Sequence, residues 1–537
     1  MNAVLSAAQM SELDARAQRD FGIPGLVLME HAGSALSEAL KRHMSECRCT
    51  RAGSSCIYVV AGRGNNGGDG LVVARLAAIE RQYRVVIVDA GCTEAAPSSQ
   101  TAVHLASCRA LGVPVVSENE LAGVVSPGDW IVDAISGTGI KGPLTSEKQR
   151  LVEQLNAIVS MGARRSEDGE RSGRPEVPVA SCSRPFVFAV DVPSGLGDEF
   201  EQTFPVLSAD VTATVGWYKR CLLTPAGRRH CGSIELLDIF FPRELDSDTP
   251  EIAYIEEQDI GSVLPLVPET AHKGTRGHLA VVAGAQGSAR AALLCSAAAS
   301  NARAGLVSLF TDTAVASRIE GLRPQLMVRG TSDPVADMRA SGRRIDALLV
   351  GPGWGHGRER RNLLPDLLAM SNRGVIDADA LTLLAHMEPD EFSLLTGGDW
   401  LLTPHPAECA RLAGRPVSDV LERPDLVAAE VADKYGATVL LKASTSWIAD
   451  PHGLLRVFDG THRAAGTGGS GDVLAGVCGA LMASGLGSFA AATAAAVIHA
   501  RAVQQAFAAS GWFNADTLAA SIGAAIVELE QTGGNYR

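Results

Sequence analysis

Short apolar runs alternate with longer amphipathic stretches along most of the 537 residues. Runs rich in Val, Ile and other apolar residues are typical of buried strands, and in the first half of the chain they occupy 57–61, 84–89, 113–116, 130–135 and 186–191. Apolar residues at helical spacing occupy 6–20, 26–41, 98–111 and 147–160. This alternation predicts an α/β fold with a parallel sheet.

The same alternation restarts in the second half of the chain. Runs typical of strands and strand ends occupy 278–284, 306–310, 347–350, 374–381, 400–408 and 438–446, and an Ala-rich helical pattern occupies 289–304. A charged, Pro-containing segment at 238–249 separates the halves, and we expect a domain boundary there. The polar segment 162–185 is rich in Arg, Gly, Pro and Ser and is expected to form an inserted surface loop.

Composition narrows the class of protein. Hydrophobic residues make up 46% and charged residues 20% of the chain, as in a compact globular protein. A formal charge of −13 argues against a nucleic-acid-binding or acidic-membrane-binding surface. The sequence shows no apolar run of bilayer length and no secretory signal pattern at its start. The 11 Cys residues show no zinc-binding spacing, so reduced thiols and a cytoplasmic location are expected.

The clearest candidate for an anion-binding and catalytic site is the stretch from Gly466 to Asp472, where four of seven residues are glycine. A helical pattern follows directly, so free backbone N–H groups at its start would face any bound anion. Asp472 lies where that helix is expected to begin. Its carboxylate is a candidate proton acceptor for a hydroxyl that attacks phosphorus, or simply the residue that caps the helix.

Three strands of the first half also end in residues suited to ligand binding. A glycine-rich turn with Asn and Asp at 62–70 follows the run at 57–61 and resembles the start of a nucleotide-binding βαβ unit. Another glycine-rich loop, 136–143, follows the run at 130–135. Asp191 ends a third run, where it is expected either to face a ligand or to cap the turn before Pro193.

These motifs resemble those of two known families. Residues 1–245 resemble the NAD(P)H-hydrate epimerases through 62–70, 133–139 and 191–195. Residues 246–537 resemble the NAD(P)H-hydrate dehydratases, a branch of the ribokinase-like kinases, through 272–274, 351–355, 377–381, 403–408 and 466–476. The resemblance implies an N-terminal Rossmann-like αβα sandwich followed by a C-terminal ribokinase-like αβα domain.

The resemblance also implies a reaction on hydrated NADH and NADPH, called NADHX and NADPHX, which form as R and S epimers at C6. The first domain would interconvert the epimers. The second would dehydrate the S epimer by phosphorylating its hydroxyl group and then eliminating phosphate. The residues leave open whether ADP or ATP is the phosphoryl donor, and the resemblance favours ADP.

For the epimerase domain the resemblance implies a potassium site formed by Asn66, Asp133 and Ser194, whose hard oxygen donors suit that ion. It assigns proton transfer to Asp191. The residues implied to contact the substrate are Asn65, Asn66, Gly67, Gly68, Asp69, Gly137, Thr138, Gly139, Ile140, Lys141, Gly142, Pro143 and Asp191. His31 stands where Asn is usual, and we expect it either to influence the site or to be a structural histidine.

For the dehydratase domain the resemblance implies Asp472 as the base and Glu408 as a residue that organises Mg²⁺. Implied substrate contacts are Ala291, Gly353, His405 and Asp472, with a structural role for His405 as the alternative. Implied nucleotide contacts are Lys442, Ala443, Ser444, Thr445, Ser446, Gly468, Gly469 and Gly471. The chain departs from the family pattern at Arg290, Gln325 and Ala443, and none of these departures touches Asp472 or its glycine loop.

Two other functions remain open from the residues alone. The C-terminal half is also compatible with a ribokinase-like small-molecule kinase that releases a phosphorylated product. The N-terminal half would then be a binding domain without catalysis, and relatives of this fold serve as RNA-binding or scaffold domains. The acidic charge and the Asn66, Asp133 and Asp191 set favour the epimerase. Both families form homo-oligomers, so a homo-oligomer is expected.

Overall fold

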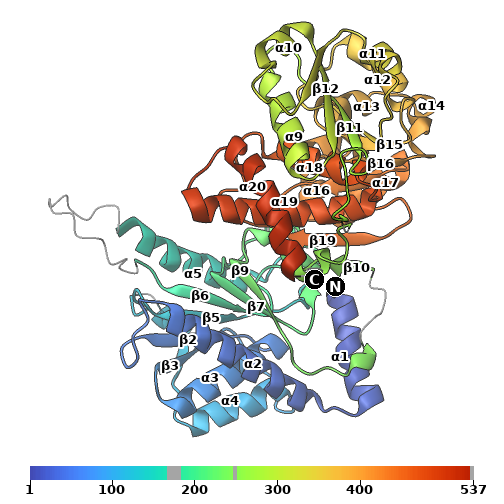
Figure 1. Ribbon diagram of the computed structural model, residues 1–537. Helices are drawn as coiled ribbons and strands as arrows, with labels where there is room; N and C mark the ends of the chain where they lie inside the picture. The colour runs from blue at the N-terminus through green and yellow to red at the C-terminus, as the bar shows by residue number, and fades with distance from the viewer. Residues whose placement is uncertain (122, 166–182, 246–250, 266, 533–537) are drawn as a thin grey trace, which may run out of the picture. The chain divides into compact units, whose positions relative to one another are not determined.

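The computed structural model describes residues 1–121, 123–165, 183–245, 251–265 and 267–532. The chain divides into two compact units, an N-terminal unit of Asn2–Pro250 and a C-terminal unit of Glu251–Arg537 to which Met1 also belongs. Both units are α/β layers, so the expected fold class is confirmed (Figure 1). Most of the predicted insertion at 162–185, and the end of the charged segment at 238–249, lie outside the described residues.

The N-terminal unit is built on a parallel sheet with strand order β4-β3-β2-β5-β6-β7-β9. Its strands are β2 (Cys56–Ala61), β3 (Arg84–Asp89), β4 (Val115–Ser117), β5 (Trp130–Ala134), β6 (Phe186–Val190), β7 (Val211–Val215) and β9 (Ser233–Leu237). β1 (Asn2–Leu5) pairs in parallel with β8 (Tyr218–Lys219). The five strands expected here are confirmed, whereas β1, β7, β8 and β9 were not predicted.

Alternate residues of each strand face opposite sides of this sheet. Ile57 and Val59 pack into one core with residues of α2–α4, whereas Tyr58 and Val60 pack into another with α5. Figure 1 shows this arrangement of helices on the two faces. The helices are α1 (Ala7–Phe21), α2 (Gly25–Glu46), α3 (Asn65–Glu80), α4 (Gln100–Ala110), α5 (Ser146–Arg165), α6 (Arg220–Leu223) and α7 (Pro225–Arg228), with 3-10 turns η1 (Cys92–Glu94), η2 (Glu118–Glu120) and η3 (Arg243–Leu245).

Helix α3 begins earlier than the glycine-rich motif suggested. We expected a loop through residue 70, but the helix begins at Asn65. The reason is close packing, because a Cβ at Gly67 would lie only 1.9 Å from the carbonyl oxygen of Gly62. Glycine at this position therefore brings the first turn of α3 against the end of β2.

The C-terminal unit is built on a longer sheet with strand order β13-β12-β11-β14-β15-β16-β17-β18-β19-β10. Its strands are β10 (Ile252–Tyr254), β11 (His278–Val282), β12 (Leu306–Thr311), β13 (Met327–Gly330), β14 (Ala347–Val350), β15 (Arg373–Ile376), β16 (Asp399–Leu402), β17 (Thr438–Leu441), β18 (Thr445–Ala449) and β19 (Leu455–Asp459). Pairing is parallel from β13 to β17 and antiparallel from β17 through β19. The run at 438–446 therefore contains β17, a turn at 442–444 and the start of the antiparallel strand β18, and not one strand end.

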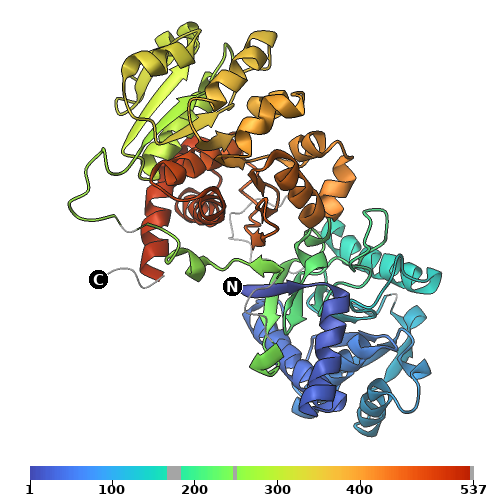
Figure 2. The same cartoon turned by 90° about the vertical axis from the view of Figure 1, so that its right-hand side faces the viewer.

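One face of this sheet is covered by α9 (Ala289–Asn301), α18 (Ser470–Ala483), α19 (Ser488–Ser510) and α20 (Ala515–Thr532). The last three (red) pack together in both views (Figure 1, Figure 2). The remaining helices are α8 (Glu257–Ile260), α10 (Thr313–Ile319), α11 (Pro334–Ser341), α12 (Arg358–Leu368), α13 (Asp379–Leu384), α14 (Pro389–Phe392), α15 (Pro406–Ala413), α16 (Val417–Glu422) and α17 (Pro424–Tyr435), with the 3-10 turn η4 (Ser393–Leu395). Among the described helices, none has the length and apolar character needed to cross a membrane.

We predict that Gly476→Ala destabilises the C-terminal unit. A Cβ at Gly476 on α18 would lie 2.1 Å from the carbonyl oxygen of Cys295 on α9, so the two helices would have to move apart. Such overpacking costs about 1–3 kcal/mol, measurable as a lower denaturation midpoint with faster hydrogen exchange in α18.

The matched control is Gly523→Ala on α20. There a new Cβ would lie 3.5 Å from the carbonyl oxygen of Asn301, an ordinary contact. This change should be neutral or stabilise the unit by about 0.4–1 kcal/mol, because alanine restricts the unfolded chain more than glycine does. Equal stability of the Gly476 variant and the wild type would contradict the packing argument.

Candidate functional site

The N-terminal unit has a cavity of about 450 Å³ beside the ends of its parallel strands. The loops after β2, β5 and β6 contribute to its lining, together with α1, α3 and β8. The residues predicted for substrate binding that line it are Asn65, Asn66, Asp69, Gly137, Thr138, Gly139, Ile140 and Asp191. Five others do not line it, since Gly67 and Gly68 are buried within α3, and Lys141, Gly142 and Pro143 lie farther along the loop after β5.

Asp191 follows β6 with a backbone φ of 65°, an uncommon conformation for a residue with a side chain. Its Oδ1 atom lies 2.5 Å from the Nζ atom of Lys219, and Thr214 Oγ1 and the Val215 amide also donate to it, at 3.1 and 3.2 Å. Lys219 is only 1% exposed and also donates to the Val215 carbonyl oxygen. The carboxylate is thus held by the neighbouring β7–β8 segment, which argues against the alternative that it caps its own turn.

Asp133 ends β5 in a fully buried position next to Ser194. The Ser194 amide donates to its Oδ2 atom at 2.7 Å, and the Ser194 hydroxyl donates to its Oδ1 atom at 2.5 Å. Burial nevertheless raises the pKa of Asp133 to about 6. No Lys or Arg among the described residues forms an ion pair with it, so its charge lacks a cationic partner within that part of the protein.

Asn66 lies beside the same loop, because a Cβ at Gly137 would be 3.4 Å from its Oδ1 atom. The side-chain Nδ2 atom of Asn66 is buried without a hydrogen-bond partner in the described structure. A buried carboxylate without a cationic partner is what a bound cation with oxygen ligands would stabilise. Asn66 could offer such an ion its Oδ1 atom, whereas its unpaired Nδ2 atom is a donor and does not bind a cation. The residues present therefore fit a monovalent cation at Asn66, Asp133 and Ser194.

Asp14 on α1 and Lys219 on β8 are among the charged residues of this cavity that sequence reasoning did not predict. Asp14 occupies a polar position of an amphipathic helix, where a surface role is the usual one. Lys219 lies in the mostly apolar run 215–223, and a single lysine inside such a run was the available signal.

The C-terminal unit has a cavity of about 520 Å³ at the start of α18. The predicted residues that line it are His405, Glu408, Lys442, Ala443, Ser444, Ser446, Gly468, Gly469, Gly471 and Asp472. Thr445 is fully buried at the start of β18 and does not line it. The structure therefore brings the glycine loop and the turn between β17 and β18 to one cavity.

Helix α18 begins at Ser470, and Gly469 precedes it with a φ of 94°. No side chain caps the helix, so Asp472 is not its cap. Its Oδ2 atom lies 3.9 Å from the place of a Cβ on Gly469, so the carboxyl group points back toward the loop. Burial raises the pKa of Asp472 to about 6, with Asp377 adding to the shift and Lys442 opposing it.

Lys442 and Asp377 form a buried ion pair under the loop, with Nζ 2.6 Å from Oδ1. Thr403 Oγ1 donates to the same carboxylate oxygen at 2.8 Å. Burial lowers the pKa of Lys442, but Asp377 and the nearby Glu408 outweigh that effect and the pKa is raised. A Cβ on Gly471 would lie 3.3 Å from Nζ, so this ammonium group lies against the first turn of α18. Asp377 belongs to the motif at 377–381 but was not among the predicted site residues.

His405 and Glu408 together cap helix α15. The His405 amide donates to Glu408 Oε2 at 2.9 Å, while His405 Nδ1 accepts from the Ala407 amide at 3.1 Å. His405 Nε2 also lies 3.3 Å from Glu408 Oε1. The structural role considered for His405 is therefore present, although the residue also lines the cavity. Within the described ranges, no three His, Cys, Asp or Glu side chains form a metal-binding group.

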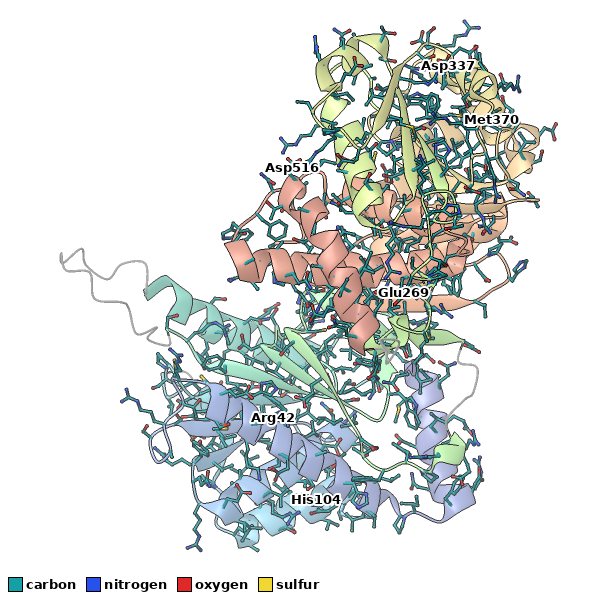
Figure 3. All side chains as sticks on the ribbon, viewed as in Figure 1. Arg42, His104, Glu269, Asp337, Met370 and Asp516 are labelled. Atoms are coloured by element: carbon teal, nitrogen blue, oxygen red, sulfur yellow. The ribbon has the colours of Figure 1, made fainter. Side chains whose placement is uncertain are left out.

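A Cβ on Gly353 would be 3.0 Å from that of Ala291, so these two residues lie together. Neither of them lines this cavity. Leu294, one turn along α9, contacts the glycine loop, since a Cβ on Gly469 would lie 2.6 Å from its Cδ1 atom. Nearby, Arg290 donates to Asp516 at 2.9 Å. Figure 3 labels Asp516, which lies in the first turn of α20. Of the predicted substrate contacts, His405 and Asp472 therefore line the cavity, whereas Ala291 and Gly353 do not.

His499 on α19 is a cavity residue that the sequence analysis did not select. Its Nε2 atom lies 3.0 Å from Ser470 Oγ and 3.1 Å from the Ser470 carbonyl oxygen. Burial lowers the pKa of His499 to about 4, so the imidazole is neutral at physiological pH. A neutral histidine therefore holds the first residue of α18.

The two units together define a class of two-domain α/β proteins with a ligand cavity at the strand ends of each domain. A family model described as NAD(P)H-hydrate dehydratase matches residues 279–524, and one described as YjeF-related protein N-terminus matches residues 25–221. The bifunctional NAD(P)H-hydrate repair enzyme Nnr of Coxiella burnetii is 30% identical over 512 residues, covering 94% of this chain and 95% of the relative. The chain belongs to the family of bifunctional NAD(P)H-hydrate repair enzymes.

Other similarities cover the same regions. The enzyme of the same name from Moorella thermoacetica is 30% identical over 526 residues, covering 94% of this chain and 92% of the relative. A crystal structure of the ADP/ATP-dependent NAD(P)H-hydrate dehydratase from Bacillus subtilis, crystallised with ATP and Mg²⁺, matches 52% of this chain and 98% of its own length. The TM-score of that match is 0.47 and the sequence identity is 22%.

We predict that Lys219→Met strongly destabilises the N-terminal unit. The change leaves the Asp191 carboxylate largely buried without its cation, and breaking such a pair costs roughly 3–5 kcal/mol. Denaturation of the full chain, with hydrogen exchange in β6 and β7 as the local readout, measures the loss.

The matched variant is Lys219→Met combined with Asp191→Asn, which removes both charges. This double variant should recover most of the lost stability, because no uncompensated charge remains. Equal instability of the single and double variants would show that Lys219 contributes through packing and not through the ion pair.

Proposed function

We propose that this protein repairs hydrated NADH and NADPH by two activities on one chain. The N-terminal unit epimerises the R and S hydrates at C6, and the C-terminal unit dehydrates the S epimer with a nucleotide. The observation that carries the proposal is the match to a bifunctional relative over 94% of the chain, since that match spans both cavities. We assign the epimerase to residues 1–245 and the dehydratase to residues 246–537.

In the N-terminal unit, the dinucleotide would occupy the cavity between α1 and the loops after β2, β5 and β6. The amide groups at the start of α3 and the loop from Gly137 to Pro143 would hold its phosphates. Asp191, fixed by Lys219, would transfer a proton at the nicotinamide end. A potassium ion held by Asn66, Asp133 and Ser194 would supply positive charge beneath the loop that carries Gly137.

In the C-terminal unit, the nucleotide would contact Lys442–Ser446 and the glycine loop, and the S hydrate would approach from the side of Ala291 and Gly353. Asp472 would remove the proton from the C6 hydroxyl as that oxygen attacks the terminal phosphorus. The backbone N–H groups of Gly468–Gly471 would stabilise the transferring phosphoryl group. Phosphate then leaves C6 with its electron pair more readily than hydroxide would. C5 loses a proton to water, and the electrons of that C5–H bond form the C5–C6 double bond.

Mg²⁺ would enter bound to the nucleotide phosphates, which suits a site where Glu408 is already committed to His405. When bound, the ion would neutralise phosphate charge. We propose ADP as the phosphoryl donor, and a cytoplasmic homo-oligomer as the working form. The acidic net charge and the family membership support that last proposal.

The experiment that tests the proposal uses the full chain, mixed hydrate epimers and either ADP or ATP. Recovery of the absorbance of reduced nicotinamide, with one inorganic phosphate released per cofactor, supports repair. A stable phosphorylated product would instead support the alternative of a small-molecule kinase. RNA binding at physiological salt would support a binding role for the N-terminal unit.

We predict that Asp472→Asn abolishes dehydration and leaves epimerisation intact, because the amide cannot accept the proton. Loss of a general base typically lowers the rate about 10²–10⁴-fold. In the wild type, dehydration should decline as the pH falls through about 6, where Asp472 becomes protonated, and the residual rate of the variant should lack this decline. Nucleotide-dependent repair at near wild-type rate would exclude Asp472 as the base.

We predict that Asp133→Ala or Asn66→Ala disables the epimerase alone. With mixed epimers and excess nucleotide, the wild type should convert the whole pool. The variant should convert the S portion rapidly and then stall, because the R portion epimerises only slowly without catalysis. Measuring the plateau with and without a separate active epimerase checks this; slow processing of pure S hydrate would show that the two sites are not independent.

A further inference from the structure

The N-terminal cavity is lined by more carboxyl groups than a single proton transfer requires. The charged side chains that line it are Asp14, Arg63, Asp69, Lys148, Asp191 and Lys219. Asp191 is paired with Lys219. Within the part of the chain that the structure describes, neither Asp14 nor Asp69 forms an ion pair, so these two carboxyl groups face one cavity without a dedicated cation.

The two carboxyl groups come from different elements, Asp14 from the second turn of α1 and Asp69 from the first turns of α3. Burial raises the pKa of Asp14 to about 6, Lys219 opposes the shift and Asp191 adds to it. Burial also raises the pKa of Asp69 well above its usual range, with Asp191 and then Asp14 adding to the shift. Carboxyl groups that share a poorly solvated site retain a proton that isolated ones would lose.

The basic side chains that line the cavity are placed so that the proton stays on the carboxyl groups of Asp14 and Asp69. Lys219 is committed to Asp191, and Arg63 is exposed at the turn before α3. Lys148 on α5 donates to the Ile135 carbonyl oxygen at 3.4 Å, and burial, with Arg63, lowers the pKa of its ammonium group. The cavity thus has one carboxylate fixed by a lysine and a separate pair of carboxyl groups, on α1 and α3, with affinity for a proton.

We propose that Asp14 and Asp69 act as a second proton-transfer group of the epimerase, delivering a proton to the C6 hydroxyl as it leaves and recovering one when water returns. This inference rests on the proposed epimerase function and names groups for it beyond Asp191.

The step balances without any added reagent. The C6–O bond breaks with its electron pair going to oxygen, and the carboxyl pair gives that oxygen a proton, so water leaves. The lone pair of the ring nitrogen forms a double bond to C6, which becomes planar. Water then adds to the opposite face, the electron pair returns to nitrogen, and the proton released returns to the carboxyl pair.

The test measures interconversion of purified R and S hydrates by the full chain without nucleotide, so that dehydration does not occur. Asp14→Asn and Asp69→Asn should each lower the rate about 10²–10⁴-fold. The matched control is Glu12→Gln, a carboxyl-to-amide change on the exposed side of the same helix, which should leave the rate unchanged.

Two further readouts distinguish proton transfer from a structural role. In the wild type, kcat/KM should decline as the pH rises above the pKa of the carboxyl pair. In Asp69→Asn this decline should move to lower pH, because Asp14 loses a negatively charged neighbour. In water enriched in oxygen-18, the epimerised product should carry the label at C6. Retention of the original oxygen in the wild type would overturn the proposed step.

Stability provides the remaining control. A carboxyl group whose pKa is higher in the folded state than in the unfolded state destabilises the fold as the pH rises through that interval, here from about 4 to about 6 for Asp14. Asp14→Asn should therefore be at least as stable as the wild type at neutral pH, and a loss of stability that accounts for its lost rate would overturn the inference.

The outcomes separate this inference from the proposed function. A wild type that does not accelerate epimerisation refutes the proposed function itself. An active wild type with Asp14→Asn and Asp69→Asn as active as Glu12→Gln leaves the proposed function standing and overturns the role of the carboxyl pair.

Discussion

Close contact between glycine and a backbone carbonyl positions the helices on which both sites depend. At Gly67 a Cβ would lie 1.9 Å from the carbonyl oxygen of Gly62, and at Gly476 it would lie 2.1 Å from that of Cys295. Any side chain at either position would push α3 or α18 away from its neighbour. The free N–H groups at the start of each helix would move with it, away from the acids that share the cavity.

The acids of the two cavities are controlled by burial and by one lysine each. Lys219 fixes Asp191 in the N-terminal cavity, and Lys442 fixes Asp377 in the C-terminal one. In each case another aspartate in the same cavity forms no ion pair with a lysine among the described residues, and its pKa is raised. The shared design places a charge-stabilised carboxylate beside a carboxyl group with high proton affinity, which suits sites that transfer protons near neutral pH.

The sequence allowed the central parallel strands to be predicted, because runs such as 57–61 and 347–350 are continuous and apolar. It did not predict β7, where buried Thr212 and Thr214 interrupt the apolar pattern. The glycine-rich turn at 62–70 suggested a loop, whereas close packing allows those glycines to be helical. The glycine loops and their acids were predictable from short motifs. Lys219, Asp14 and His499 were not, since their roles come from partners distant in sequence.

Each cavity is lined by residues of one unit only, 7–239 for the first and 377–500 for the second. The two units that carry these activities are nevertheless translated as one polypeptide, so a cell contains them in equal numbers. Their balance cannot be adjusted by separate expression and depends on the turnover rate of each site alone. A substitution that slows one site therefore changes the ratio of the two activities, and a change in expression level cannot restore it.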